Sequence, residues 1–179
     1  MKPRGPLMIE HRLIEEMLEI VKQKTSEIKA TNKINPVFLD TAVDFIRIYA
    51  DKTHHGKEEK IMFRDCLKKN MSLEDTKIMN ELIEEHKAAR KTVAELVKAK
   101  EDYLQGKNTI NIIIEKLNFL TKFYPKHIEK EDKIFFPNTE KYFTEDELQI
   151  MLKEFWEFDK TMIHEKYKSV VEQFKNKNC

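Results

Sequence analysis

Glycine, proline and cysteine are scarce in this chain. Its 179 residues include 3 glycines, 5 prolines and 2 cysteines. Sandwiches and barrels need many tight turns, which glycine and proline commonly form, so the composition argues against an all-β fold. The two cysteines, Cys66 and Cys179, make no disulfide framework, and reduced thiols in a cytosolic protein fit them best.

Long apolar runs and an excess of one charge are also missing. The longest uncharged apolar stretch is far too short to span a membrane, and the N-terminus lacks the apolar core of a signal peptide. We therefore expect a cytoplasmic protein with no membrane partner. Charged residues make up 36% of the chain, yet the net charge is only +1. No basic run or stripe points to nucleic acid as a partner.

Apolar residues recur at intervals of three and four through most of the chain, which predicts secondary structure that is nearly all helical. Capping residues support the boundaries of the predicted helices: Asn35 precedes Pro36, Gly106 is a natural C-terminal stop, and Thr144 with Glu147 forms a capping box. The predicted helices cover about residues 7–30, 35–69 with a bend near Gly56, 72–106, 109–135 and 144–174.

Short turns between these helices predict that sequential helices are antiparallel neighbours. We expect an all-α fold, in which the first four helices form an up-down-up-down four-helix bundle over about residues 7–137. The additional C-terminal helix, about residues 144–175, would pack against the outside of the bundle or across one end. The length of 179 residues fits a single domain, residues 1–179.

A pattern of histidine and glutamate occurs twice in the sequence. In each copy a Glu-His pair is followed, 43 or 41 residues after its histidine, by a second histidine with a glutamate four positions beyond it. An internal duplication of this kind indicates the architecture of the fold. The first copy contains Glu10, His11, His54 and Glu58, and the second contains Glu85, His86, His127 and Glu131.

These histidines and glutamates are expected to point into the bundle. On a helix a residue four positions on lies nearly above its predecessor, so each histidine of a His-x-x-x-Glu pair faces the same way as its glutamate. A lone core histidine is more often hydrogen-bonded than metal-bound, but two matching copies are hard to obtain by accident. Buried carboxylates and unpaired imidazoles are costly, and divalent cations relieve that cost. Two half-sites suggest two metal ions, with Glu58 and Glu131 bridging them.

At these residues the sequence resembles the hemerythrin-like domains, in particular their bacterial and archaeal His-His-Glu branch. The resemblance rests on His11, residues 54–59, residues 85–86 and residues 127–131, and it covers roughly residues 7–137. It implies a non-haem centre of two iron ions with carboxylate bridges and an oxo or hydroxo bridge; zinc or manganese could substitute in such a donor set. Carried over by position, the terminal ligands are His11, His54, His86 and His127, and the bridges are Glu58 and Glu131.

Two departures from the family pattern matter. Oxygen-carrying hemerythrins have a second histidine four residues after the one on the third helix, and here that position is Arg90. His164, inside the fifth helix, is the best candidate for the additional ligand. A register one residue later would use His55 with Glu59, or Asp132 in the second copy. The near-repeat favours the earlier register, which leaves His55 behind the ligands or on the surface.

Two functions of different classes fit this reading. Fewer protein ligands leave metal coordination positions open to small molecules. The first function is a cytosolic di-iron protein that binds, senses or reduces a small diatomic or peroxide ligand, namely O₂, NO or H₂O₂. The second is an iron-handling or iron- and redox-sensing module without turnover, which acts through a protein partner. The sequence does not decide whether the protein is an enzyme.

Overall fold

Helices account for all the regular secondary structure of residues 2–176, which are the residues that the structure, a computed structural model, describes. Within the last helix, side chains are described as far as Lys166 and at Lys168. The all-α prediction is therefore confirmed for this part of the chain. The elements are α1 (Arg4–Thr31), α2 (Pro36–Phe45), η1 (Ile46–His55), η2 (Glu58–Phe63), α3 (Arg64–Cys66), α4 (Leu73–Leu104), α5 (Ile110–Lys130), η3 (Glu131–Phe135), α6 (Phe136–Glu140) and α7 (Glu145–Asn176).

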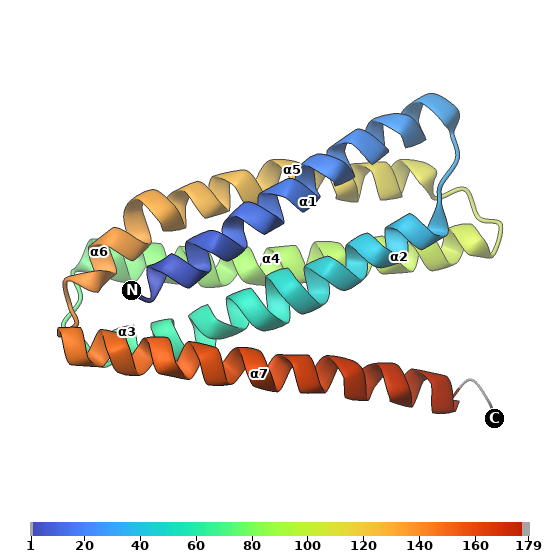
Figure 1. The fold of residues 1–179 in the computed structure, drawn as a ribbon. Coiled ribbons are helices and arrows are strands. Elements are labelled where there is room, and N and C mark those ends of the chain that lie inside the picture. The colour runs from blue at the N-terminus through green and yellow to red at the C-terminus, as the bar shows by residue number, and fades with distance from the viewer. Residues whose placement is uncertain (1, 177–179) are drawn as a thin grey trace.

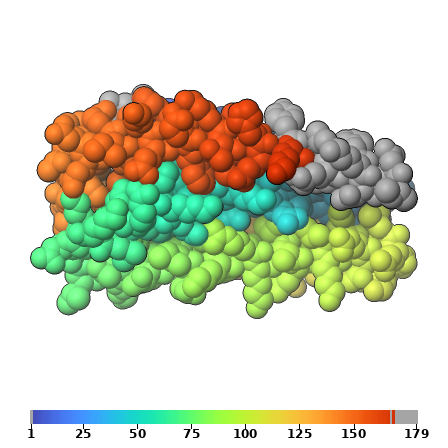
Figure 2. Space-filling model, turned by 90° about the horizontal axis from the view of Figure 1, so that it is seen from below, coloured from blue at the N-terminus to red at the C-terminus, as the bar shows by residue number. Residues whose placement is uncertain are grey.

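These elements combine into five rods (Figure 1). The second rod consists of α2, η1, η2 and α3, which follow one another without leaving helical geometry. The fourth rod consists of α5, η3 and α6. Together with α1 and α4, these rods run alternately up and down, as the sequence predicted. The helix α7 lies lengthwise outside this bundle and contacts η1 and η2 of the second rod (Figures 1 and 2).

Side-chain caps fix where several rods begin. The Asn35 carboxamide oxygen accepts hydrogen bonds from the backbone N–H groups of Val37 and Phe38, at 3.0 and 3.2 Å. At the start of α7, Thr144 and Glu147 exchange the two hydrogen bonds of a capping box, at 2.9 and 3.3 Å. Such caps satisfy backbone groups that have no partner inside the helix. The structure thus confirms these predicted starts.

Three stretches, η1, η2 and η3, are π-helical, and the sequence analysis did not predict them. In η1 the Thr53 hydroxyl donates to the carbonyl oxygen of Ile48, five residues earlier, at 2.8 Å. Consecutive side chains of an α-helix point about 100° apart. A π-turn is wider, so the angle between neighbours is smaller, and such turns often occur at functional sites. Both His54 and His55 can therefore face the inside of the bundle.

Gly56 lies where α7 packs against the second rod. Its dihedral angles, φ −61° and ψ −40°, are those of an ordinary helix. A Cβ atom at this position would lie only 2.9 Å from Cζ of Phe158 on α7. The glycine therefore gives α7 room to pack closely against the rod.

Apolar side chains form two clusters, one on each side of a polar layer in the middle of the bundle. The larger cluster includes Leu18, Leu96 and Leu117. The smaller cluster includes Phe63 and Phe136, and α7 adds Phe155 to it. Met62, Phe63, Phe135 and Phe136 are all buried in the smaller cluster. Over the described range, no helix is both long and apolar enough to cross a bilayer.

Candidate metal centre

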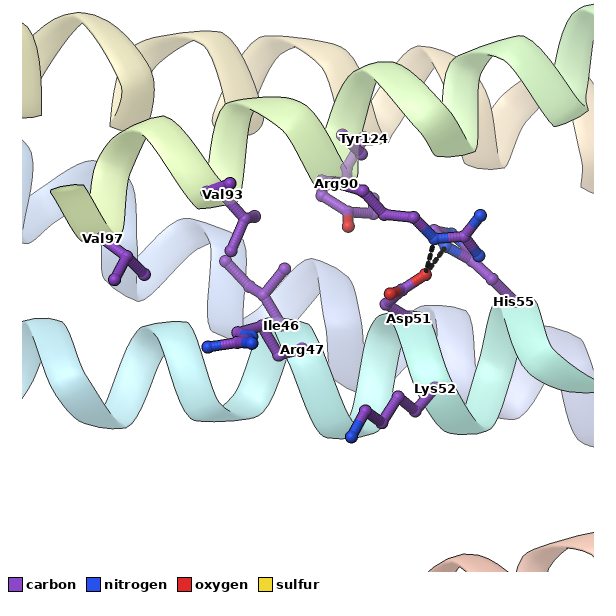
Figure 3. Close-up of a pocket in the computed structure, with 11 residues that line it drawn as sticks. Ile46, Arg47, Asp51, Lys52, His55, Arg90, Val93, Val97 and Tyr124 are labelled. Carbon is purple, nitrogen blue, oxygen red and sulfur yellow. Dashed lines mark hydrogen bonds and ion pairs between the residues drawn. The ribbon is translucent and has the colours of Figure 1, made fainter.

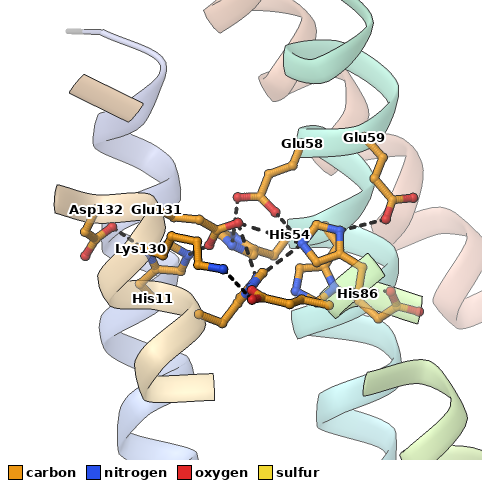
Figure 4. A network of polar contacts seen from close by, with 12 residues as sticks. His11, His54, Glu58, Glu59, His86, Lys130, Glu131 and Asp132 are labelled. Atoms are coloured by element: carbon orange, nitrogen blue, oxygen red, sulfur yellow. Dashed lines mark hydrogen bonds and ion pairs between the residues drawn. The ribbon is translucent and has the colours of Figure 1, made fainter. Parts of the chain in front are cut away.

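The polar layer between the apolar clusters contains five histidines and two glutamates contributed by four rods. Figure 4 shows His11, His54, His86, Glu58 and Glu131 among them. None of these side chains is more than 2% exposed. The six residues that the sequence predicted as ligands are all present, and one further histidine joins them. The set consists of His11 from α1, His54 and His55 from η1, Glu58 from η2, His86 from α4, His127 from α5 and Glu131 from η3.

The seven side chains divide into two groups with the spacing of metal ligands. In each group, one nitrogen or oxygen atom per residue can be chosen so that all lie within 4.8 Å of one another. Each group is therefore compact enough to surround one cation. The two-histidine group is His11, His54, Glu58 and Glu131, and the three-histidine group is His55, His86 and His127.

Each glutamate reaches toward both groups. Glu58 places Oε1 3.4 Å from Nε2 of His54 and Oε2 3.5 Å from Nε2 of His86. Glu131 places Oε2 3.2 Å from Nε2 of His11 and Oε1 3.3 Å from Nε2 of His127. In Figure 4 the two carboxylates lie between the imidazoles. This is the position that a bridging carboxylate between two cations requires.

The inner atoms of this layer have a deficit of hydrogen bonds. Among the described residues, no hydrogen-bond partner exists for Nε2 of His11, Nε2 of His54 or any carboxylate oxygen of Glu58 and Glu131. Leaving buried polar atoms unsatisfied destabilises a fold. Imidazole and carboxylate donors suit iron, zinc and manganese. Divalent cations would satisfy these atoms, so the residues fit a pair of bound metal ions.

Each of the five histidines of the centre contacts a carboxylate on the side facing away from the centre. Each imidazole donates its Nδ1–H to that carboxylate, so its Nε2 lone pair points inward, as in histidines that bind metals. Nε2 of His86 and Nε2 of His127 lie 3.2 Å apart, at hydrogen-bonding distance, and a shared cation would take the place of the proton between them. The Nδ1 distances are 2.7 Å from His11 to Asp132, 2.8 Å from His54 to Glu10, 3.3 Å from His55 to Asp51, 2.7 Å from His86 to Glu59 and 2.8 Å from His127 to Glu85.

The ionisable side chains of the centre shift one another's pKa values. Burial and the negative charge of Glu131 raise the pKa of Glu58 well above its usual range. Burial also acts to raise the pKa of Glu131, but His127 and His11 outweigh it and hold that pKa well below its usual range. Burial acts to lower the pKa of His11, whereas Asp132 and Glu131 raise it to about 9. Bound cations would take the place of these protons.

The additional histidine is His55, which corrects two expectations. His164 is exposed on α7 and belongs to neither group, so the structure does not support it as the extra ligand. His55 was expected behind the ligands or on the surface, yet it is 1% exposed and forms part of the three-histidine group. The physical reason is the π-helical turn, which lets two consecutive histidines face inward.

Arg90 takes no part in either group. Its Nε donates to Asp51 at 2.7 Å, and its Nη2 donates to Glu59 at 2.9 Å. These two carboxylates are the acceptors for His55 and His86. Arg90 therefore positions two histidines from outside the centre and is not a replacement ligand.

Comparison with known families gives one result that covers most of the chain. Residues 6–164 match the model described as the hemerythrin HHE cation binding domain. Neither the comparison with curated proteins nor the comparison with solved structures gave a match. The matched range contains all seven side chains of the centre and every carboxylate behind them. The chain belongs to the family of hemerythrin HHE cation-binding domains.

Proposed function

We propose that this protein holds two iron ions and binds, senses or reduces a small ligand, namely O₂, H₂O₂ or NO. The observation that carries the proposal is the inequality of the two groups. One cation position has three imidazoles within reach, and the other has two. Glu58 directs one oxygen to each of the two positions, and so does Glu131.

When one oxygen of each glutamate is counted at each cation position, the position of the two-histidine group has four protein donors and the other has five. A metal with open coordination positions is reactive, whereas a metal whose positions are filled by protein is structural. Two iron ions would supply redox capacity and an open position for the small ligand. The proposal therefore places that ligand beside His11 and His54.

Around this position the chain excludes water and large molecules. The His11 ring stacks on Phe136, with ring centres 5.8 Å apart and an angle of 11° between planes. Phe136 and the rest of the smaller apolar cluster close one side of the polar layer. The ligand must therefore be small, which agrees with a diatomic molecule or a peroxide.

A second candidate function is an iron-handling or iron-sensing module that acts through a protein partner. Lys57 favours it, because this fully buried side chain connects the centre with α7. Its ammonium group donates to Glu10, the acceptor for His54, and lies 2.7 Å from Asp159 on α7. A change at His54 can thus reach the outside of the bundle through one hydrogen bond, to Glu10, and two ion pairs of Lys57.

The first test is metal analysis of protein purified without oxygen, followed by absorption spectroscopy of the reduced protein exposed to O₂. We expect about two iron ions per chain and a charge-transfer band after exposure. Two bound iron ions without a band for O₂, H₂O₂ or NO would contradict the first function. Helices that melt when iron is removed, with no band for any of these ligands, would favour the second function.

A further inference from the structure

A cavity of about 340 Å³ opens between the second rod and α4 (Figure 3). Of the seven side chains of the centre, only His55 lines it. Five of its eleven lining residues are aliphatic: Ile46 comes from η1, and Ala89, Val93, Ala94 and Val97 come from α4. Its size lies in the range of small-molecule sites, which are commonly apolar with a few polar groups. The cavity therefore has the dimensions and lining of a binding site for a small organic molecule.

Positive charge predominates in the lining. Arg47, Lys52 and Arg90 contribute three cations, and Asp51 contributes the one carboxylate. Asp51 is already engaged, because it accepts from Nε of Arg90 at 2.7 Å and from Nδ1 of His55 at 3.3 Å. Among the described residues, neither Arg47 nor Lys52 has a side-chain hydrogen bond or ion pair. The cavity thus offers positive charge without a matching anion.

We propose that this cavity binds a small amphipathic carboxylate, such as the anion of a medium-chain fatty acid. The acyl chain lies against Ile46, Val93 and Val97, where it removes apolar surface from water. The carboxylate pairs with Arg47, whose planar guanidinium matches a carboxylate with two parallel N–H donors. A neutral molecule would leave this charge unused, and a cation would meet three like charges.

Asp51 joins this site to the metal centre. The same carboxylate orients His55 of the three-histidine group and holds Arg90 of the cavity wall. Figure 3 shows both interactions meeting at Asp51. An anion bound to Arg47 in this cavity therefore changes the electrostatic field at Asp51, a lining side chain that positions a histidine of the centre.

The test is isothermal titration of the protein as purified with octanoate, and with octanamide as its neutral analogue. For a ligand with as few non-hydrogen atoms as octanoate, we expect a Kd of about 0.1 to 1 mM. We expect octanamide to bind at least about fivefold more weakly, because it lacks the charge that pairs with Arg47. Equal affinities, or no octanoate binding, would overturn the proposal.

Variants locate the site. Arg47→Glu should weaken octanoate binding at least about fivefold. Lys33→Glu, a charge reversal at an exposed position that does not line the cavity, should leave it unchanged. Ala94→Trp should abolish binding, because Ala94 is an exposed residue of the cavity wall and an indole there fills the space. Circular dichroism verifies that each variant is folded. Binding that survives Ala94→Trp would place octanoate elsewhere, including directly on the metal, and would refute this site.

Discussion

The two halves of the bundle have the same arrangement of histidines and carboxylates and differ at single residues. The first half is α1 with the second rod, and the second half is α4 with the fourth rod. Glu10 accepts from His54 within the first half, and Glu85 accepts from His127 within the second. Two other carboxylates cross between the halves and join them: Asp132 accepts from His11, and Glu59 accepts from His86.

The differences between the halves are few and local. Where the first half has His55, the second half has Ile128, so only one half supplies a third nitrogen. Lys57 is fully buried beneath α7, whereas its counterpart Lys130 keeps a side chain that is 25% exposed. The repeat thus provides a symmetric set of candidate ligands, while single substitutions and one added helix make the two candidate metal positions unequal.

The largest effect is expected where both halves meet, at Glu131. Its two oxygens face His11 of one group and His127 of the other. Glu131→Ala should therefore reduce iron from about two ions per chain to below about one, because both positions lose an oxygen donor. Metal analysis measures the loss. Glu129→Ala, at an exposed position on the same rod, is the matched control and should keep all the iron.

Making the halves alike should remove one metal position. In His55→Ile the first half acquires the isoleucine of the second, and the three-histidine group loses one imidazole. We expect iron affinity at that position to fall about 10- to 100-fold, while the two-histidine group keeps its iron. Competition with a chelator measures both affinities. His164→Ile should leave both unchanged, and an equal loss in this control would restore His164 as a ligand.

The two lysines should differ in their contribution to stability. Lys57→Met leaves Glu10 and Asp159 without their buried cation, which should cost about 2 to 4 kcal/mol of unfolding free energy. Lys130→Met breaks contacts of a partly exposed side chain with Glu85 and Glu81 and should cost about 1 kcal/mol or less. Urea denaturation of the metal-loaded variants compares them. Equal costs would mean that coverage by α7 has no energetic consequence.

The smallest effect concerns Cys66, which occupies the place of Thr139 in the other half. Burial raises the pKa of this thiol to about 12. The thiolate is the reactive form, so a raised pKa lowers its population at every pH below that value. In a Cys179→Ser background at pH 8, iodoacetamide should leave the folded protein unmodified and alkylate it after unfolding. Mass spectrometry detects the adduct, and rapid alkylation of the folded protein would contradict the burial of Cys66.

The sequence was sufficient to predict the bundle because its helices follow ordinary rules. Apolar spacing gave five helices, and caps such as Asn35 and Thr144 begin helices in the structure where they were expected. The duplicated pattern also brought six inward-facing ligand candidates together. Their convergence follows from α-helical geometry, in which residues four apart share a face.

His55 was misplaced because the sequence carries no simple signal for a π-helical turn. With α-helical angles, His54 and His55 diverge, and one of them had to be left out. Two of the carboxylates behind the histidines, Glu10 and Glu85, could have been found, since they precede His11 and His86 in the repeat. Asp51 has no counterpart in that pattern, so only the folded chain shows its contact with His55.

The apolar clusters on both sides of the centre set how fast its ions can exchange. Every candidate ligand atom belongs to a side chain that is at most 2% exposed, so a chelator could not reach ions bound there in the closed bundle. Release must wait for a transient separation of the rods, as amide hydrogen exchange does. The lifetime of bound metal should then lengthen as the folded state becomes more stable, even when no ligand is altered.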